Sequence, residues 1–247
     1  MSSGAKIRLY ACEEAVLGTT PANPVWYTVR RVTDSLTENV TTEDSSEVVD
    51  SRFRQGAVVT EAEVTGQLEF ELSLGTFDLF LNVLAFNNWA ANALSFGGGV
   101  RKSLTLVKVF EDIGQVFIYR GIQVNTGEMT IQTLTINFSN NLEAIRCIGS
   151  GKYTPEFYLE KMMDIGVNAN FMFSATSASW IDAIKTRDVF TLTFDITDTK
   201  GSKYSFNFPQ LEVKEANHPD GGGDDIITID INFAQVRTSP TIVRALV

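Results

Sequence analysis

The sequence predicts a mainly β protein with short flanking α-helices. Many short segments alternate polar and apolar residues with the period of two that a half-buried strand requires. Residue types that favour strands are frequent, with 17 Phe in 247 residues and dense Thr, Val and Ile. Few stretches have helical character. A chain of this length, 44% hydrophobic, can bury a core as one large domain or two smaller ones.

The clearest predicted strand is segment 60–74, in which even-numbered positions are mostly apolar and odd-numbered positions are polar. One face of this strand is therefore expected in solvent and the other on a core. The run is long for a strand, so Gly66 is predicted to mark a bend or a bulge. The polar face carries four carboxylates: Glu61, Glu63, Glu69 and Glu71.

Similar alternation predicts further strands and two hairpins. In segment 129–137 the apolar set changes parity after Thr133, which predicts a β-bulge. The hairpins are predicted at 104–118 and 190–206, each with a polar turn. The other predicted strands are 189–198, 203–208 and 227–233.

Two short helices are predicted at 76–85 and 177–185, and a third candidate is 156–164, after Pro155. Thr76 is positioned to cap the first helix, with Asp78 in its first turn. Segment 35–50 is polar and acidic without periodicity, so it is predicted to be a long functional loop or arm. Segment 217–225 is predicted to be a flexible loop between two strands.

The chain shows signs of an internal duplication. Segments 66–84 and 166–184 both read as a strand, a small turn and a short helix, and each is followed by one of the predicted hairpins. This predicts two tandem pseudo-repeats, 1–150 with an N-terminal arm and the acidic 35–50 loop, and 151–247. The alternative is that a β protein has reused a common pattern by chance.

Composition excludes several functional classes. The chain has 20 Lys and Arg residues and 30 Asp and Glu residues, so its formal charge is −10. This charge argues against tight binding to nucleic acid phosphates. Cys12 and Cys147 form no CxxC pair and are predicted to be buried thiols. The sequence has a single histidine, His218. A Ser–His or Cys–His catalytic pair would have to use this residue, and a metal site with several histidines is excluded. No secretion signal and no membrane span are expected.

Candidate motifs for chemistry are weak. Segment 96–103 is glycine-rich but has Arg101 where a phosphate loop needs glycine before Lys-Ser. Asp220, Asp224 and Asp225 lack the spacing of an EF-hand, so a solvated loop is the better interpretation. The paired carboxylates of 60–74 could suit an inverting glycosidase, yet an acidic stripe on one strand is more simply a solvated face. A face that must repel an anionic polymer is a further interpretation.

One set of motifs resembles a known family. Arg52, Arg54 and Gln55 precede the strand with Gly66, which is followed by Gly75-Thr76-Phe77-Asp78 at a helix start and by Trp89. Segment 102–125 then adds a hairpin with Phe-x-Asp-Ile and Gly-x-x-Val-Asn motifs. In this order the motifs resemble the tail tube proteins of long-tailed bacteriophages (siphoviruses) over about 100 residues, whereas the second half matches weakly.

The resemblance implies a tail-tube-type β-sandwich or barrel with no catalysis, cofactor or metal. Such subunits form homo-oligomeric rings that stack into a tube, hold the tape-measure protein and conduct viral DNA during ejection. A duplicated subunit implies a trimeric ring and a single unit a hexameric one. The virion tail, assembled in the host cytoplasm, is the expected location, without membrane contact. The candidate residues facing the lumen are Glu61, Glu63, Glu69, Glu71, Asp195 and Asp230, and the inter-ring candidates are Glu43, Asp44, Arg52 and Arg54.

Two alternatives stay open at this point. Another virion ring protein, such as a tail terminator or distal tail protein, would form a single ring and would not polymerise. A carbohydrate-binding or glycosidase β-sandwich would gather aromatic side chains around Trp26, Trp89 or Trp180. For all six lumen candidates, an exposed outer face is the competing interpretation.

Overall fold

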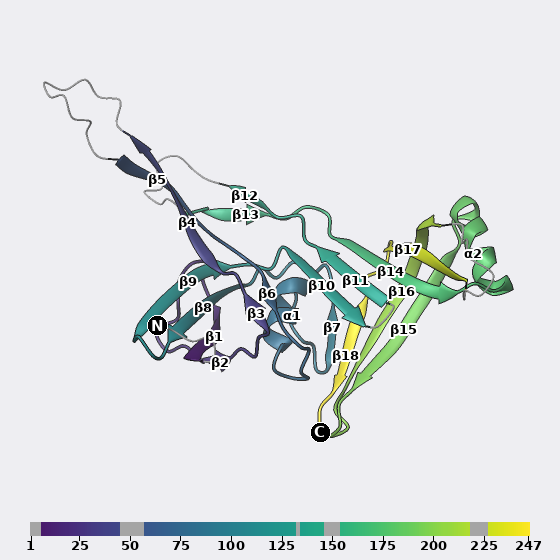
Figure 1. Cartoon of the computed structure of the whole chain (residues 1–247), viewed down its shortest axis with the longest axis horizontal. Helices are drawn as coiled ribbons and strands as arrows, with labels where there is room; N and C mark the ends of the chain where they lie inside the picture. Colours follow the sequence, from purple (N-terminus) through teal and green to yellow (C-terminus); the bar gives the residue numbers. More distant parts are fainter. Residues whose placement is uncertain (1–5, 45–56, 132–133, 146–153, 218–226) are drawn as a thin grey trace, which may run out of the picture. The chain divides into compact units, whose positions relative to one another are not determined.

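The computed structural model describes residues 6–44, 57–131, 134–145, 154–217 and 227–247 (Figure 1). The chain forms two compact units that interleave along the sequence. Unit 1 comprises Met1–Thr76, Lys102–Gln123 and Leu142–Glu160, and unit 2 comprises Phe77–Arg101, Val124–Asn141 and Lys161–Val247. Both units are built mainly of antiparallel strands, which confirms the predicted mainly β class. The division into pseudo-repeats 1–150 and 151–247 stays a prediction, because elements of the first half contribute to both units.

Unit 1 contains a four-stranded sheet in the order β2-β1-β8-β9. Its strands are β1 (Ile7–Glu14), β2 (Tyr27–Thr28), β8 (Ser103–Phe110) and β9 (Gln115–Ile122). The middle of one face of this sheet is buried: Leu9, Ala11 and Leu106 are at most 2% exposed, and Ala11 lies beside Leu106 in the strand register. The predicted hairpin at 104–118 is confirmed as β8 and β9.

Three two-stranded pairs complete unit 1. They are β3 (Thr33–Asp34) with β6 (Leu68–Glu69), β4 (Thr37–Asp44) with β5 (Ala57–Thr65), and β12 (Glu143–Ile145) with β13 (Phe157–Leu159). The segment 35–50, predicted to be a long loop or arm, contains β4, because pairing with β5 supplies backbone hydrogen bonds that its polar sequence does not predict. The candidate helix at 156–164 is wrong: β13 forms there, and its aromatic and leucine residues pair with β12.

Strand β5 ends at Thr65, directly before Gly66, where the sequence predicted a bend or a bulge. The Gly66 φ of +147° lies in a region that side-chain-bearing residues rarely adopt. A Cβ at this position would also lie 2.7 Å from the Cα of Leu36, so only glycine allows this close approach. The chain resumes pairing as β6 at Leu68, and residues 70–73 are irregular. The predicted strand 60–74 is thus two separate strands followed by a coil.

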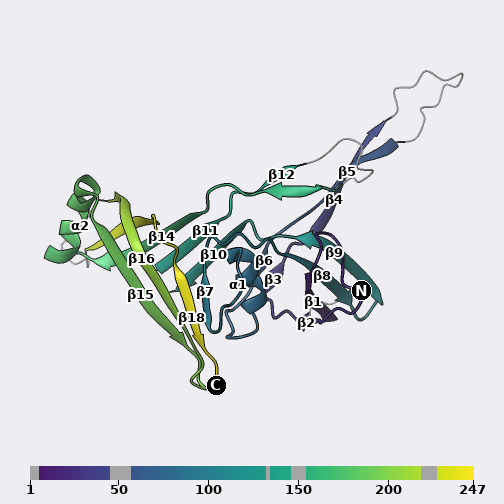
Figure 2. The same cartoon turned by 180° about the vertical axis from the view of Figure 1, so that it is seen from behind.

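Unit 2 contains an eight-stranded sheet in the order β10-β11-β14-β17-β16-β18-β7, with β15 also pairing with β16. Figure 2 shows β15, β16 and β18 side by side. The parity change at 129–137 is not a bulge: β10 and β11 pair as a hairpin across it. The strands are β7 (Ala93–Ser95), β10 (Thr126–Ile131), β11 (Leu134–Ser139), β14 (Asp164–Met172), β15 (Val189–Thr197), β16 (Lys203–Ala216), β17 (Thr228–Gln235) and β18 (Thr241–Ala245).

The two predicted helices are present in unit 2, as α1 (Asp78–Ala85) and α2 (Ala175–Thr186). Helix α1 begins after Phe77, with no side-chain cap, so the predicted cap by Thr76 is wrong: its hydroxyl instead donates to the carbonyl of Ser73 at 3.0 Å. Helix α2 begins two residues earlier than predicted, because Ser174 forms a capping box with Ser177.

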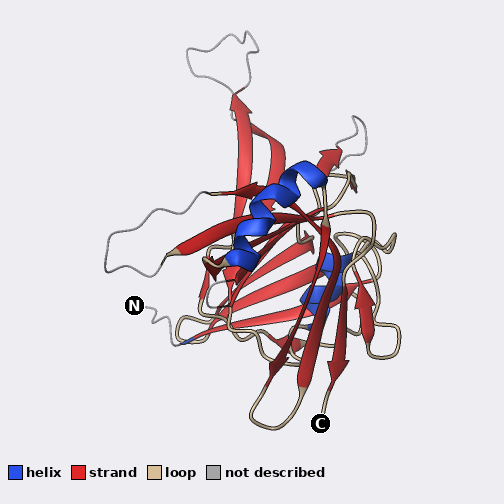
Figure 3. Ribbon diagram, turned by 90° about the vertical axis from the view of Figure 1, so that its right-hand side faces the viewer, coloured by secondary structure: helices blue, strands red, loops and turns tan. Residues whose placement is uncertain are grey.

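Both helices are held by buried contacts within unit 2. The amide of Asn140 donates to the carbonyls of Leu84, in the last turn of α1, at 3.1 Å and of Val124 at 2.8 Å. The Trp180 ring of α2 packs edge-on against Phe171 and Phe190, so α2 covers the strands that Figure 3 shows behind it. No helix among the described residues is long and apolar enough to cross a membrane.

Candidate functional surfaces

Strands β4 and β5 form an amphipathic ribbon, here called the arm, which Figure 1 shows extending beyond the four-stranded sheet. Glu61 lies opposite Thr41 and Glu63 opposite Asn39, and by the period of two Glu43 shares this polar face. The other face is mainly apolar and carries Val40, Val59, Ala62 and Val64. Every charged residue in the two strands is acidic.

The predicted acidic stripe is divided by the break at Gly66. Glu61 and Glu63 belong to the arm, whereas Glu69 lies on β6 and accepts a hydrogen bond from the Thr33 hydroxyl at 3.0 Å. Glu71 follows in the irregular segment. Asp44 occupies the last position of β4, opposite Ala57 of β5. The arm therefore contains four of the predicted site residues: Glu43, Asp44, Glu61 and Glu63.

Several sequence candidates lie outside the described residues. Arg52 and Arg54, two of the inter-ring candidates, are among them. Cys147, His218 and the aspartates at 220, 224 and 225 are also outside. Cys12 is a buried free thiol whose pKa is raised, mainly by its burial. Within the described ranges no three His, Cys, Asp or Glu residues gather closely enough to hold a metal ion.

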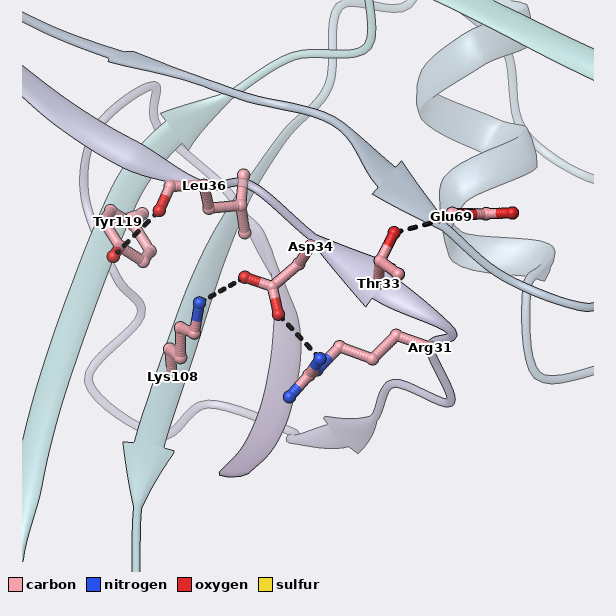
Figure 4. A network of polar contacts seen from close by, with 7 residues as sticks. All are labelled: Arg31, Thr33, Asp34, Leu36, Glu69, Lys108 and Tyr119. Carbon is pink, nitrogen blue, oxygen red and sulfur yellow. Dashed lines mark hydrogen bonds and ion pairs between the residues drawn. The ribbon is translucent and has the colours of Figure 1, made fainter. Parts of the chain in front are cut away.

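A buried ion-pair network fixes the base of the arm (Figure 4). The Asp34 carboxylate, whose side chain is 2% exposed, pairs with Arg31 at 2.9 Å and with Lys108 of β8. Next to it the Tyr119 hydroxyl of β9 donates a long hydrogen bond, 3.4 Å, to the carbonyl of Leu36. The pKa of Tyr119 is raised, first by desolvation and then by the charges of Asp34 and Glu38. The chain segment that enters the arm is therefore anchored to β8 and β9.

Sequence reasoning missed this network because its members are far apart along the chain. Asp34 and Lys108 are separated by 74 positions, and neither belongs to a motif. A second buried carboxylate, Glu14, was missed for the same reason. It accepts hydrogen bonds from the Ser103 and Thr105 hydroxyls, at 2.6 and 2.7 Å, and from the amides of Gly18 and Gly121, at 2.9 and 3.0 Å.

The eight-stranded sheet has one apolar and one polar face. Ile136, Val167, Ile229 and Ile231 are buried on the first. The second face carries mainly short amide and hydroxyl side chains, with some carboxylates among them. These side chains form rows across neighbouring strands, such as Thr135–Asn168–Asn232 and Glu128–Asn137. The second face includes Thr135, Asn137, Asn168, Asn170, Asn232, Glu128, Glu215 and Asp230. This set is here called the polar face.

Of the two predicted carboxylates of the second half, Asp230 belongs to the polar face and Asp195 lies on β15. Asp230 accepts a hydrogen bond of 2.7 Å from the Asn170 amide of its cross-strand partner. Asp195 of β15 lies opposite Ser205 and pairs with Lys203 at 3.1 Å. The hydrogen bond from Ser205, followed by Lys203, lowers the pKa of Asp195. The lowered pKa means that Asp195 carries its negative charge at neutral pH.

Asp78, the last residue of the Gly75–Asp78 motif, and Trp89 have a structural role in unit 2. The Asp78 carboxylate of α1 accepts a hydrogen bond from the Tyr204 hydroxyl and pairs with Arg244. The Trp89 indole donates to the Asp78 carbonyl at 3.4 Å, stacks on Tyr204 and lies 4.5 Å from the Arg244 guanidinium. This cluster joins α1 to β16 and β18, and Tyr204 and Arg244 were not identified from the sequence.

Comparisons with known proteins agree with these features. A family model described as phage tail tube protein matches residues 4–133, which include the arm, the Asp34 network and the segment from Gly75 to Trp89. The match covers more than half of the 247 residues. No curated protein matches the chain. The chain belongs to the phage tail tube protein family and is a structural component of the virion tail.

Proposed function

We propose that copies of this chain form rings that stack into a hollow tube, and that the polar face of the eight-stranded sheet lines the bore through which viral DNA passes. Family membership supports a non-enzymatic, tube-building role. The observation that carries the bore assignment is the division of the sheet into a buried apolar face and a face of short amides, hydroxyls and carboxylates.

The chemistry of the polar face suits a passage for an anionic polymer. Carboxylates repel phosphate groups, and short neutral amides offer no cationic site at which a backbone could bind. A formal charge of −10 per subunit gives −60 for a ring of six before counterions condense, and −30 for a ring of three. The wall therefore keeps DNA mobile, and before ejection the same bore holds the tape-measure protein.

The arm extends this proposal to ring stacking. We assign Glu61 and Glu63, on the acidic side of the arm, to the bore of the tube as well, and the apolar side of the arm to a contact with another subunit. Glu43 and Asp44 occupy the last two positions of β4, and we assign them to contacts with the next ring. Arg52 and Arg54, the other inter-ring candidates, lie outside the described residues. Glu69 and Glu71 add negative charge beyond the arm. Assembly takes place in the host cytoplasm.

Electron microscopy of the purified full-length chain tests the proposed function. Long hollow tubes are the expected result, and a cross-section decides between three and six subunits per ring. Single rings would instead indicate a tail terminator or distal tail protein. Monomers at high concentration that bind a sugar would indicate the carbohydrate-binding alternative.

The bore assignment has a separate test. Glu215→Lys with Asp230→Lys places four units of positive charge change on the polar face, and we expect tubes that form but bind DNA and eject it poorly. Asp182→Lys with Asp188→Lys makes the same change in charge at α2 and just after it, and serves as the matched control. Equal DNA binding by both variants would contradict a bore lined by the polar face.

A further inference from the structure

Unit 1 has an open apolar groove on the side of its four-stranded sheet opposite the buried Leu9 and Leu106. The groove has a volume of about 310 Å³ and is lined by Tyr10, Trp26, Val107 and Ile118. Tyr10, Val107 and Ile118 form one cross-strand row through β1, β8 and β9. The Trp26 and Ile118 residues are 41% and 45% exposed. An apolar groove rimmed by polar residues is a typical feature of interaction sites.

Arginine side chains flank this groove on the same face of the sheet. Arg8 lies two residues before Tyr10 on β1 and forms an exposed pair with Glu111 at 3.2 Å. Arg120 lies two residues beyond Ile118 on β9, and its Nε donates to the Thr20 hydroxyl at 3.0 Å. The groove is thus an apolar row between two guanidinium groups.

The arm offers the complementary surface. Its apolar face carries Val40, 51% exposed, opposite Ala62 in the register, with Val59 and Val64 in neighbouring rows. Its charges are all acidic, and Glu38 lies on the same face as Val40. The two strands extend for roughly 27–30 Å, long enough to lie along the groove and reach both arginines.

We propose that the apolar face of the arm of one subunit docks into the groove of a second copy of this chain. The proposal rests on the proposed function and names the surface that receives the arm. Charge complementarity identifies the occupant, since an acidic apolar ribbon meets an apolar groove flanked by arginines. The chain's own arm leaves this groove open. Because arm and groove are different surfaces, the contact is head-to-tail, and repetition yields closed rings or an open stack.

Paired variants of the full-length chain test both halves of the contact. Val40→Glu and Ile118→Glu place a carboxylate in the arm face and in the groove. Thr41→Glu and Gln115→Glu add the same charge to the same strands on the opposite faces. We expect the first two to raise the concentration needed for assembly at least about tenfold, because each replaces an apolar contact in the middle of the interface by a charged group that must lose its hydration. The two controls should assemble like the unchanged chain.

A mixing experiment identifies the occupant. Val40→Glu keeps an intact groove and Ile118→Glu keeps an intact arm, so an equimolar mixture should form heterodimers by sedimentation velocity although each variant alone is monomeric. Val40→Thr and Ile118→Thr, which add no charge, repeat the comparison with a smaller perturbation. Circular dichroism and thermal melting establish that each variant is folded.

The outcomes separate this inference from the proposed function. If the unchanged chain forms tubes and Val40→Glu assembles normally, the arm is not the occupant and the inference is wrong, while the tube-building role stands. Loss of assembly by both glutamate variants without heterodimers on mixing would also overturn it. If the unchanged chain stays monomeric at high concentration, the proposed function itself is wrong.

Discussion

Replacing Asp34 by asparagine tests the role of the buried network at the base of the arm. The carboxylate is 2% exposed, and its partners Arg31 and Lys108 are 16% and 14% exposed, so solvent screens these charges little. Removing the charge leaves two largely buried cations without their counterion. Breaking a buried pair in this way typically costs about 3–5 kcal/mol. We therefore expect Asp34→Asn to lower the free energy of unfolding by about that amount.

The measurement is urea unfolding of the variant in a monomeric background such as Ile118→Glu. With a slope of about 2–3 kcal/mol per molar urea for a chain of this size, the midpoint should fall by roughly 1–2 M. Relative to the unchanged chain, Asp34→Asn should speed amide hydrogen exchange in β3, β4 and β5 more than in unit 2. The exposed pair Lys185–Asp182 is the control, and Asp182→Asn should change stability by less than about 0.5 kcal/mol.

A small effect of Asp34→Asn, comparable with the control, would refute the reasoning. A second substitution locates the cause of a large effect. Adding Lys108→Met to Asp34→Asn removes one of the stranded cations and should recover part of the lost stability, because the remaining cost of the buried charge falls. Failure to recover any stability would assign the loss to packing around Asp34 and not to charge.

The remaining predictions concern unit 1. Gly66→Ala should lower the melting temperature more than Gly114→Ala, because the new Cβ at residue 66 meets the backbone of Leu36 whereas the one at 114 meets nothing within 4 Å. Glu14→Gln should destabilise by about 2–3 kcal/mol in urea unfolding, since an amide donor then faces hydroxyl or amide donors, and unchanged stability would contradict the four-bond geometry. For Tyr119, the raised pKa means that the fold favours the neutral phenol. This contribution is fully present below pH 10 and is lost as pH rises through the folded pKa, so stability between pH 9 and 11 should fall more steeply than in Tyr119→Phe.

Local signals in the sequence were sufficient for much of the fold. The alternation at 189–198 and 203–208, with a glycine turn between, corresponds to the β15–β16 hairpin. Ser177 and the apolar spacing after it located α2, and Gly66 marked the end of β5 because no other residue fits its backbone. In each case the determinant lies within a few residues of the element that it specifies.

Pairings between distant segments could not be predicted in this way. Strand β4 has a polar sequence and becomes a strand only because β5 lies beside it. Segment 129–137 contains no glycine or proline turn signal, so the β10–β11 hairpin was mistaken for a bulge. Asp78 was noted as a residue of the helix start, yet its partners Tyr204 and Arg244 lie more than a hundred positions away.

The interleaving of the two units affects how the chain matures on a ribosome. Helix α1 emerges early, but the guanidinium that neutralises Asp78 follows 166 positions later. Unit 1 likewise needs β12 and β13 after a segment that belongs to unit 2. Neither unit can be completed until most of the polypeptide has been translated. A chain that stops before residue 143 would therefore lack strands of both units.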